Sequence, residues 1–123
     1  MVDVGGKEST LRQARAVGYV HLLPETLRRI LDREVQKGDV FEVSRLAGIQ
    51  ATKRTADLIP LCHPLGIDSA EIHIEPVDER TVKIESRVSV QGRTGVEMEA
   101  LTAVSVAALT MYDMCKEIGR AHV

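Results

Sequence analysis

The stretch AEIHIE at residues 70–75, followed by VKIESRVSV at residues 82–90, decides the fold. In the first stretch small or apolar residues alternate with Glu, His and Glu. The second repeats this period of two at four apolar positions: Val82, Ile84, Val88 and Val90. Because successive side chains of a strand point to opposite faces, the alternation predicts two strands with one buried and one solvated face. The polar connection at residues 77–80 makes them an antiparallel hairpin.

The sequence predicts further elements before and after this hairpin. Residues 11–23 lack helical spacing and predict a first strand, and residues 24–37 predict a helix with Pro in its first turn and Gly after its end. Asp39 is a suitable N-cap for a second helix, which we expect to run to about Leu58 and to stop before Pro60. After a break at residues 91–95, apolar residues at steps of three and four predict a long helix to about Ile118.

This last helix is apolar on most of its circumference, so we expect it to be covered on most sides. In a single domain of 123 residues a sheet can cover one flank, and a second protomer is the expected cover for the rest. The element order predicts an α+β fold, a ferredoxin-like split βαβ sandwich with an antiparallel sheet and helices on one face. Its last strand is missing, because the chain stops at residues 119–123, where that strand should begin.

Composition excludes several classes of function. Sixteen Lys and Arg oppose 18 Asp and Glu, and this net charge of −2 argues against a general nucleic-acid binder. Aromatic residues make up only 2%, which argues against stacking platforms for bases. No stretch is long and apolar enough to cross a membrane. Two cysteines do not make a secreted disulfide framework, so we expect a cytoplasmic protein.

Two polar clusters lie before and at the start of the last helix. The turn Leu61-Cys62-His63-Pro64 holds an imidazole suited to proton transfer or a phosphate contact, although this segment alone favours a half-buried structural histidine. Cys62 suggests zinc only weakly, because no second pair of ligands has the right spacing. In Thr94–Glu99, Thr94 and Glu97 have the spacing of a capping box, which leaves Glu99 without a structural explanation.

A third cluster, Asp113 with Lys116, lies near the end of that helix. Such a pair is ordinarily a minor surface ion pair, but a lysine desolvated beside a carboxylate could perform acid–base chemistry. Glu99 and Asp113 share a helix face and are ~21 Å apart along the axis, so one small ligand cannot touch both. If both act in one site, a second chain must lie antiparallel across a two-fold axis.

These clusters belong to longer motifs that resemble one family. The motifs are MVDV at residues 1–4, KGD at 37–39, AGIQATKRT at 47–55, DLIPLCHPL at 57–65, TGVEMEALT at 94–102 and YDMCK at 112–116. Together they resemble MoaC, the cyclic pyranopterin monophosphate synthase family of molybdenum cofactor biosynthesis. The resemblance covers essentially the whole chain. The family continues past Val123 with a final strand and a glycine-rich, lysine-bearing tail, which this chain lacks.

The resemblance implies conversion of 3′,8-cyclo-7,8-dihydro-GTP into cyclic pyranopterin monophosphate with release of diphosphate. It implies a cytoplasmic homohexamer, a trimer of dimers, acting after a radical SAM GTP cyclase. It implies no redox cofactor and no metal site, with Mg²⁺ accompanying the triphosphate left open. Asp113, Lys116 and Lys37 would be catalytic. The substrate would be bound by Leu61, Cys62, His63, Glu97, Met98 and Glu99, with Arg12 and Lys53 on the triphosphate.

Two other functions stay open at this point. A nucleotide- or pterin-binding regulatory module could use the same fold, since fold does not establish function, and it would bind ligand without releasing diphosphate. A metal-dependent hydrolase built on Cys62 and His63 would lose its activity to a chelator.

Overall fold

The computed structural model describes residues 6, 8–33, 35, 38–116 and 121–122. Its elements follow the predicted order: β1 (Thr10–Leu22), α1 (Pro24–Leu31), α2 (Val40–Lys53), α3 (Thr55–Leu58), β2 (Ser69–Pro76), β3 (Thr81–Gly92), α4 (Glu97–Cys115) and β4 (Ala121–His122). The hairpin predicted from alternation is β2 and β3, paired antiparallel from Ser69 with Ser89 to Pro76 with Val82. The periodicity of the sequence therefore identified the hairpin and the long helix α4 correctly.

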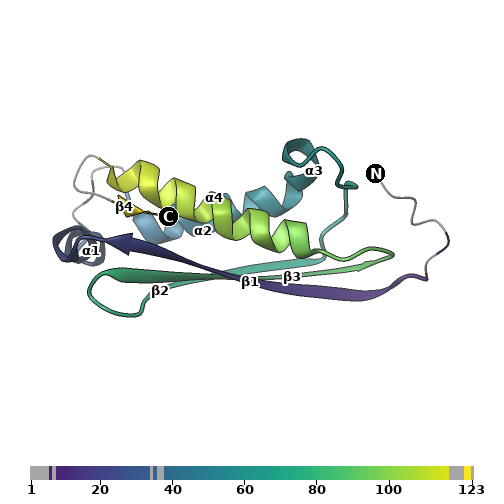
Figure 1. Cartoon of the computed structure of the whole chain (residues 1–123), viewed down its shortest axis with the longest axis horizontal. Helices are drawn as coiled ribbons and strands as arrows, with labels where there is room; N and C mark the ends of the chain where they lie inside the picture. The colour runs from purple at the N-terminus through teal and green to yellow at the C-terminus, as the bar shows by residue number, and fades with distance from the viewer. Residues whose placement is uncertain (1–5, 7, 34, 36–37, 117–120, 123) are drawn as a thin grey trace.

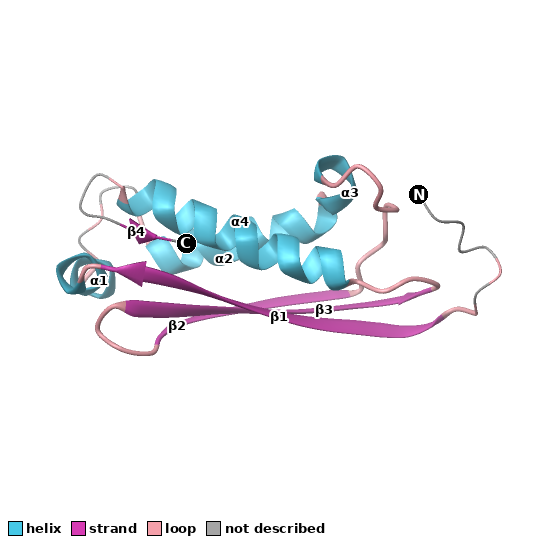
Figure 2. Cartoon of the chain, in the orientation of Figure 1, coloured by secondary structure: helices cyan, strands magenta, loops and turns pink. Residues whose placement is uncertain are grey.

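The sheet has the strand order β2-β3-β1-β4, and neighbouring strands are antiparallel. β1 and β2 consequently run parallel to each other on either side of β3, and α1 to α3 lie in the connection between them. This is the split βαβ arrangement of a ferredoxin-like fold. Figures 1 and 2 show α2 and α4 together over one face of the sheet. The predicted fold class is confirmed.

The fourth strand begins at the edge where the pattern requires it. Ala121 and His122 pair antiparallel with Leu22 and His21 at the end of β1. We expected this last strand to be missing, and that was wrong for two residues, which form β4 next to β1 rather than β2. This position is the one that a ferredoxin-like sheet assigns to it.

The core lies between the sheet and the two long helices. Val20, Ile84 and Met111 are completely buried there. At Gly48, where α2 crosses α4, an added Cβ would lie 2.9 Å from the carbonyl oxygen of Ala103 and would clash with the Ile72 side chain. A glycine at this position is therefore what lets α2 and α4 approach closely.

Two predicted helix ends are wrong. α1 ends at Leu31 rather than Lys37, because Arg33 adopts a left-handed φ of 58°, which an α-helix cannot continue. The second predicted helix breaks at Arg54 into α2 and α3. There the hydroxyl of Thr55 donates to the carbonyl of Ala51 at 2.9 Å, so a side chain competes for a helix acceptor.

The chain covers α4 on only part of its circumference. Its sheet-facing and α2-facing residues are buried, whereas Met98, Leu101, Leu109 and Tyr112 are exposed. At 100° per residue these four side chains fall within about 80° of one another, so they form one mainly apolar stripe along the helix, with the exposed Ser105 at its middle. Within the described residues, no helix combines the length and apolarity needed to cross a membrane.

Candidate functional site

One end of the sheet gathers most of the predicted substrate-binding residues. The loop that carries Leu61, Cys62 and His63 is joined to the end of β3 by Asp68. The backbone N–H of Asp68 donates to the Ser89 carbonyl at 3.0 Å, and the Asp68 carboxylate accepts from the Gln91 N–H at 2.7 Å. β3 then leads through residues 93–96 into α4. The loop and the beginning of α4 therefore lie at the same end of the molecule (Figure 1).

Arg12 belongs to this same end. It pairs in register with Val90, and because Val90 is buried under the helices, Arg12 is on the helix-facing side of β1. Its Nε donates to the Gly92 carbonyl at 3.5 Å, a long bond that leaves the remaining guanidinium donors available. A half-buried cation thus lies beside the strand that leads to α4.

The loop after α3 exposes its side chains unequally. Leu61 is 72% exposed, whereas Cys62 and His63 are half-buried. The backbone is held by short turns, with Ile59 N–H donating to Thr55 and Cys62 N–H donating to Ile59. Lys53, the last residue of α2, is exposed and precedes α3, which lies beside the beginning of α4 in Figure 1.

The beginning of α4 differs from the capping box that the sequence predicted. The helix begins at Glu97 with Val96 as its N-cap, and no side chain caps it. The prediction was wrong because Val96 is completely buried, which starts the helix two residues later than Thr94 as N-cap would require. Glu97 and Met98 are exposed on the first turn, where a carboxylate is favoured by the helix dipole.

Glu99 has a different environment from Glu97. Its side chain lies in the buried part of the first turn, and the residue is only 4% exposed. Burial raises the pKa of its carboxyl above the ordinary value, and the nearby charge of Glu97 raises it further. The sequence had left Glu99 without a structural explanation, and its burial gives its carboxyl an environment that Glu97 lacks.

The Asp113–Lys116 pair lies at the opposite end of α4. Lys116 Nζ and Asp113 Oδ1 are 3.0 Å apart, and their side chains are 45% and 59% exposed. The described part of the chain therefore leaves both side chains about half exposed, short of the desolvation that an acid–base role requires. α4 is one unbroken helix between Glu99 and Asp113, so their axial separation stays at ~21 Å. Lys37, the third predicted catalytic residue, lies outside the described residues.

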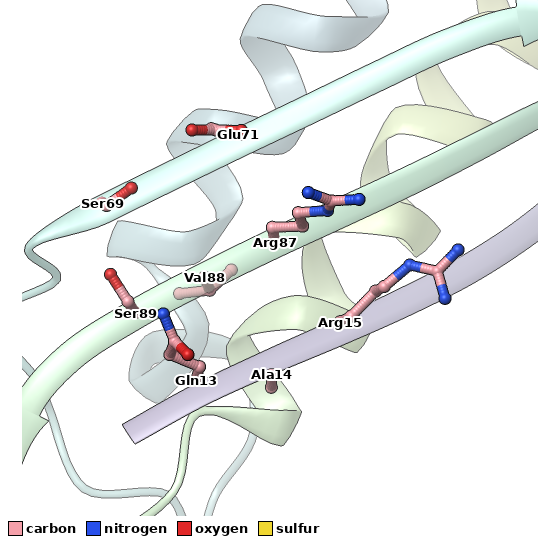
Figure 3. Close-up of a pocket in the computed structure, with 8 residues that line it drawn as sticks. All are labelled: Gln13, Ala14, Arg15, Ser69, Glu71, Arg87, Val88 and Ser89. Carbon is pink, nitrogen blue, oxygen red and sulfur yellow. The ribbon is translucent and has the colours of Figure 1, made fainter. Parts of the chain in front are cut away.

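Sequence reasoning missed a charged cluster on the open face of the sheet. Glu85 accepts from Arg15 Nη2 at 2.6 Å and from Arg87 Nε at 2.9 Å. The hydrogen bond from Arg15, with that from Arg87, lowers the pKa of Glu85 to about 2. Arg15, Arg87 and Glu71 line a pocket of about 460 Å³. Figure 3 shows these three side chains on neighbouring strands. Strand register would have revealed the cluster, because Arg15 pairs with Arg87.

In the part of the chain that the structure describes, no three His, Cys, Asp or Glu side chains come together as a metal site would need.

Comparison with known proteins places this geometry in a family. The family model of MoaC matches residues 1–123. The chain belongs to the MoaC family. A relative from Mycobacterium tuberculosis (strain H37Rv), "Cyclic pyranopterin monophosphate synthase 1", is 60% identical over 121 residues, which are 98% of this chain and 71% of the relative. "Cyclic pyranopterin monophosphate synthase" from Pelotomaculum thermopropionicum is 57% identical over 124 residues, 100% of this chain and 73% of that protein.

Proposed function

We propose that this member of the MoaC family is a cyclic pyranopterin monophosphate synthase. It converts 3′,8-cyclo-7,8-dihydro-GTP into cyclic pyranopterin monophosphate and diphosphate in molybdenum cofactor biosynthesis. The observation that carries the proposal is the identity of 57–60% with synthases over almost the whole chain. Ring opening, ring closure and phosphate cyclisation need proton transfers and cations for the leaving diphosphate, and the candidate residues supply both kinds of group.

The end of the molecule near Glu99 fits the binding of the base and the triphosphate. Glu97 and Glu99 offer carboxyls to the N–H edge of a guanine-derived ring, and His63 on the adjacent loop offers an imidazole. Arg12 and Lys53 supply positive charge at the same end for the triphosphate. We assign the catalytic proton transfers to Asp113 and Lys116, with Lys37 as a further catalytic lysine.

The substrate-binding residues near Glu99 and the Asp113–Lys116 pair lie at opposite ends of α4, so they meet only if two chains share a site. The exposed apolar stripe Met98, Leu101, Leu109 and Tyr112 runs along α4 from one group to the other. A second copy packed antiparallel on this stripe would bury it, and would bring its Asp113–Lys116 pair beside the first copy's Glu99. The same contact would desolvate the ion pair, which is about half exposed in the single chain.

The wider setting belongs to the same proposal. We infer a hexamer built from three such dimers, acting in the cytoplasm on the product of a radical SAM GTP cyclase. We infer a reaction without a redox cofactor, and whether Mg²⁺ accompanies the triphosphate stays open.

The direct test is incubation with the cyclised GTP, following diphosphate and the fluorescence of the oxidised pterin. Turnover is expected from the unmodified chain and loss of it from Lys116→Ala, with Lys83→Ala on the sheet as the matched lysine control. Binding without diphosphate release would instead indicate a regulatory module. Wild-type turnover by Lys116→Ala would refute the role of that lysine.

The shared site has a separate test in mixed oligomers. Glu99→Gln and Asp113→Asn are each expected to be inactive. Refolding them together at equal concentration puts one unmodified site in each mixed dimer, so about a quarter of all sites should regain turnover. If both residues of a site came from one chain, mixing would restore nothing.

A further inference from the structure

Ser86 is a polar exception in an apolar row of β3. The helix-facing residues of this strand are otherwise Val82, Ile84, Val88 and Val90, and Ser86 is as completely buried as Ile84. An unpaired hydroxyl in such surroundings is costly, so the hydrogen-bond partner of Ser86 is informative. Its partner therefore shows what the serine does.

The Ser86 hydroxyl donates to the carbonyl oxygen of Ala100 at 2.8 Å, in a fully buried bond. Ala100 is in the first turn of α4 and directly follows Glu99. The other hydroxyl-to-carbonyl bonds among the described residues, from Thr52, Thr55, Ser105 and Thr110, stay within a helix or its end. In the described part of the chain, Ser86 alone ties the sheet to a helix in this way.

This bond adds a directional restraint to packing that is otherwise apolar. α4 contacts the sheet and α2 through buried apolar side chains, among them Ala100, Val104 and Met111. Apolar burial by itself has no preferred direction. A hydrogen bond has a preferred length and angle, so Ser86 fixes the axial position of the first turn.

We propose that Ser86 is a positioning residue that sets the depth at which the Glu99 carboxyl lies. The carboxyl is one residue from the anchored carbonyl, and its burial depends on where the first turn lies relative to β3. The functional part of this inference rests on the proposed synthase activity. Its structural part, the coupling of Ser86 to the burial of Glu99, does not.

The test compares Ser86→Ala with Ser86→Thr, which keeps the hydroxyl, and with Val82→Ala, a buried truncation at the far end of the same strand face. With cyclised GTP we expect Ser86→Ala to lower kcat about tenfold while KM changes less than about threefold, since small misplacements of reacting groups are costly. The pH dependence of kcat should also shift in Ser86→Ala. Ser86→Thr should restore kcat and its pH dependence. Val82→Ala should lower the stability of the fold and change neither of them. Equal effects of Ser86→Ala and Val82→Ala, or no effect of Ser86→Ala, would overturn the proposal.

A second readout does not depend on activity. Glu99→Gln removes the cost of a buried carboxylate, so it should raise Tm at pH 7.5 in the otherwise unmodified chain. In the Ser86→Ala background that increase should fall by about half, because the carboxyl is then less deeply held. An undiminished increase would overturn the coupling. Absence of turnover by the unmodified chain, with the coupling intact, would count against the proposed function alone.

Discussion

The crossing of α2 over α4 makes Gly48→Ala an informative substitution. The new Cβ would lie 2.9 Å from the Ala103 carbonyl oxygen and 3.3 Å from the Ala107 Cβ, and would overlap the end of the Ile72 side chain. The Ile72 methyl can rotate away, but the Ala103 carbonyl is backbone within α4 and cannot move alone. The two helices must therefore separate.

Two opposing effects determine the magnitude. Replacing glycine by alanine within a helix gains up to ~1 kcal/mol from backbone propensity. Overpacking a core contact typically costs about 1–3 kcal/mol, and contact with backbone puts this site at the upper end. We therefore expect a net loss of roughly 1–2 kcal/mol, or a Tm lower by roughly 4–8 °C for a chain of this size.

Thermal and urea unfolding measure this change, with Gly66→Ala as the control. A Cβ at Gly66 meets no atom within 4 Å, so that variant should stay within about 0.5 kcal/mol of the parent. Because α2 leads to Lys53 and the His63 loop, Gly48→Ala should also reduce turnover at temperatures where it is folded. A Tm above that of the parent would show that helix propensity dominates and that the close crossing is not tight.

Three further substitutions test the charges and the exposed stripe. Glu99→Gln should raise Tm at neutral pH, because the raised pKa of Glu99 means that its ionised form destabilises the fold. In thermal scans below the ordinary carboxyl pKa of 4.5, the difference in Tm between variant and parent should vanish. Glu85→Gln should lower Tm at neutral pH, because the depressed pKa of Glu85 stabilises the fold above 4.5, and that difference should disappear as pH falls from 4.5 to about 2. Leu109→Glu, at a residue 63% exposed, should keep its far-UV circular dichroism but sediment as a smaller species, and an unchanged sedimentation coefficient would remove the stripe from the proposed interface.

The fold could be predicted from the sequence because its signals are periodic. Alternation over residues 70–75 and 82–90 specified the hairpin, and helical spacing specified the long helix. The ends of helices could not be predicted in the same way. They depend on single residues, such as the left-handed Arg33 and the Thr55 hydroxyl, whose conformations are set by tertiary packing.

The candidate site was predictable to different degrees. Spacing on one helix is enough to separate Glu99 from Asp113, since rise per residue is constant. The burial of Glu99 is a tertiary property, and only its position before an apolar run hinted at it. The Arg15–Glu85–Arg87 cluster needed the register of β1 against β3, which alternation alone does not give.

The exposure of Asp113 and Lys116 can be reconciled with an acid–base role by considering which surface the chain leaves uncovered. An exposed ion pair of this spacing has little effect on reactivity, because water screens both charges. Yet Asp113 is four residues after the exposed Leu109 on the same side of α4, so a second chain that covers Leu109 in the proposed dimer also covers Asp113. Desolvation of the pair and burial of the stripe are then one event. It follows that Leu109→Glu should abolish turnover together with association, although it leaves the proposed catalytic residues unchanged.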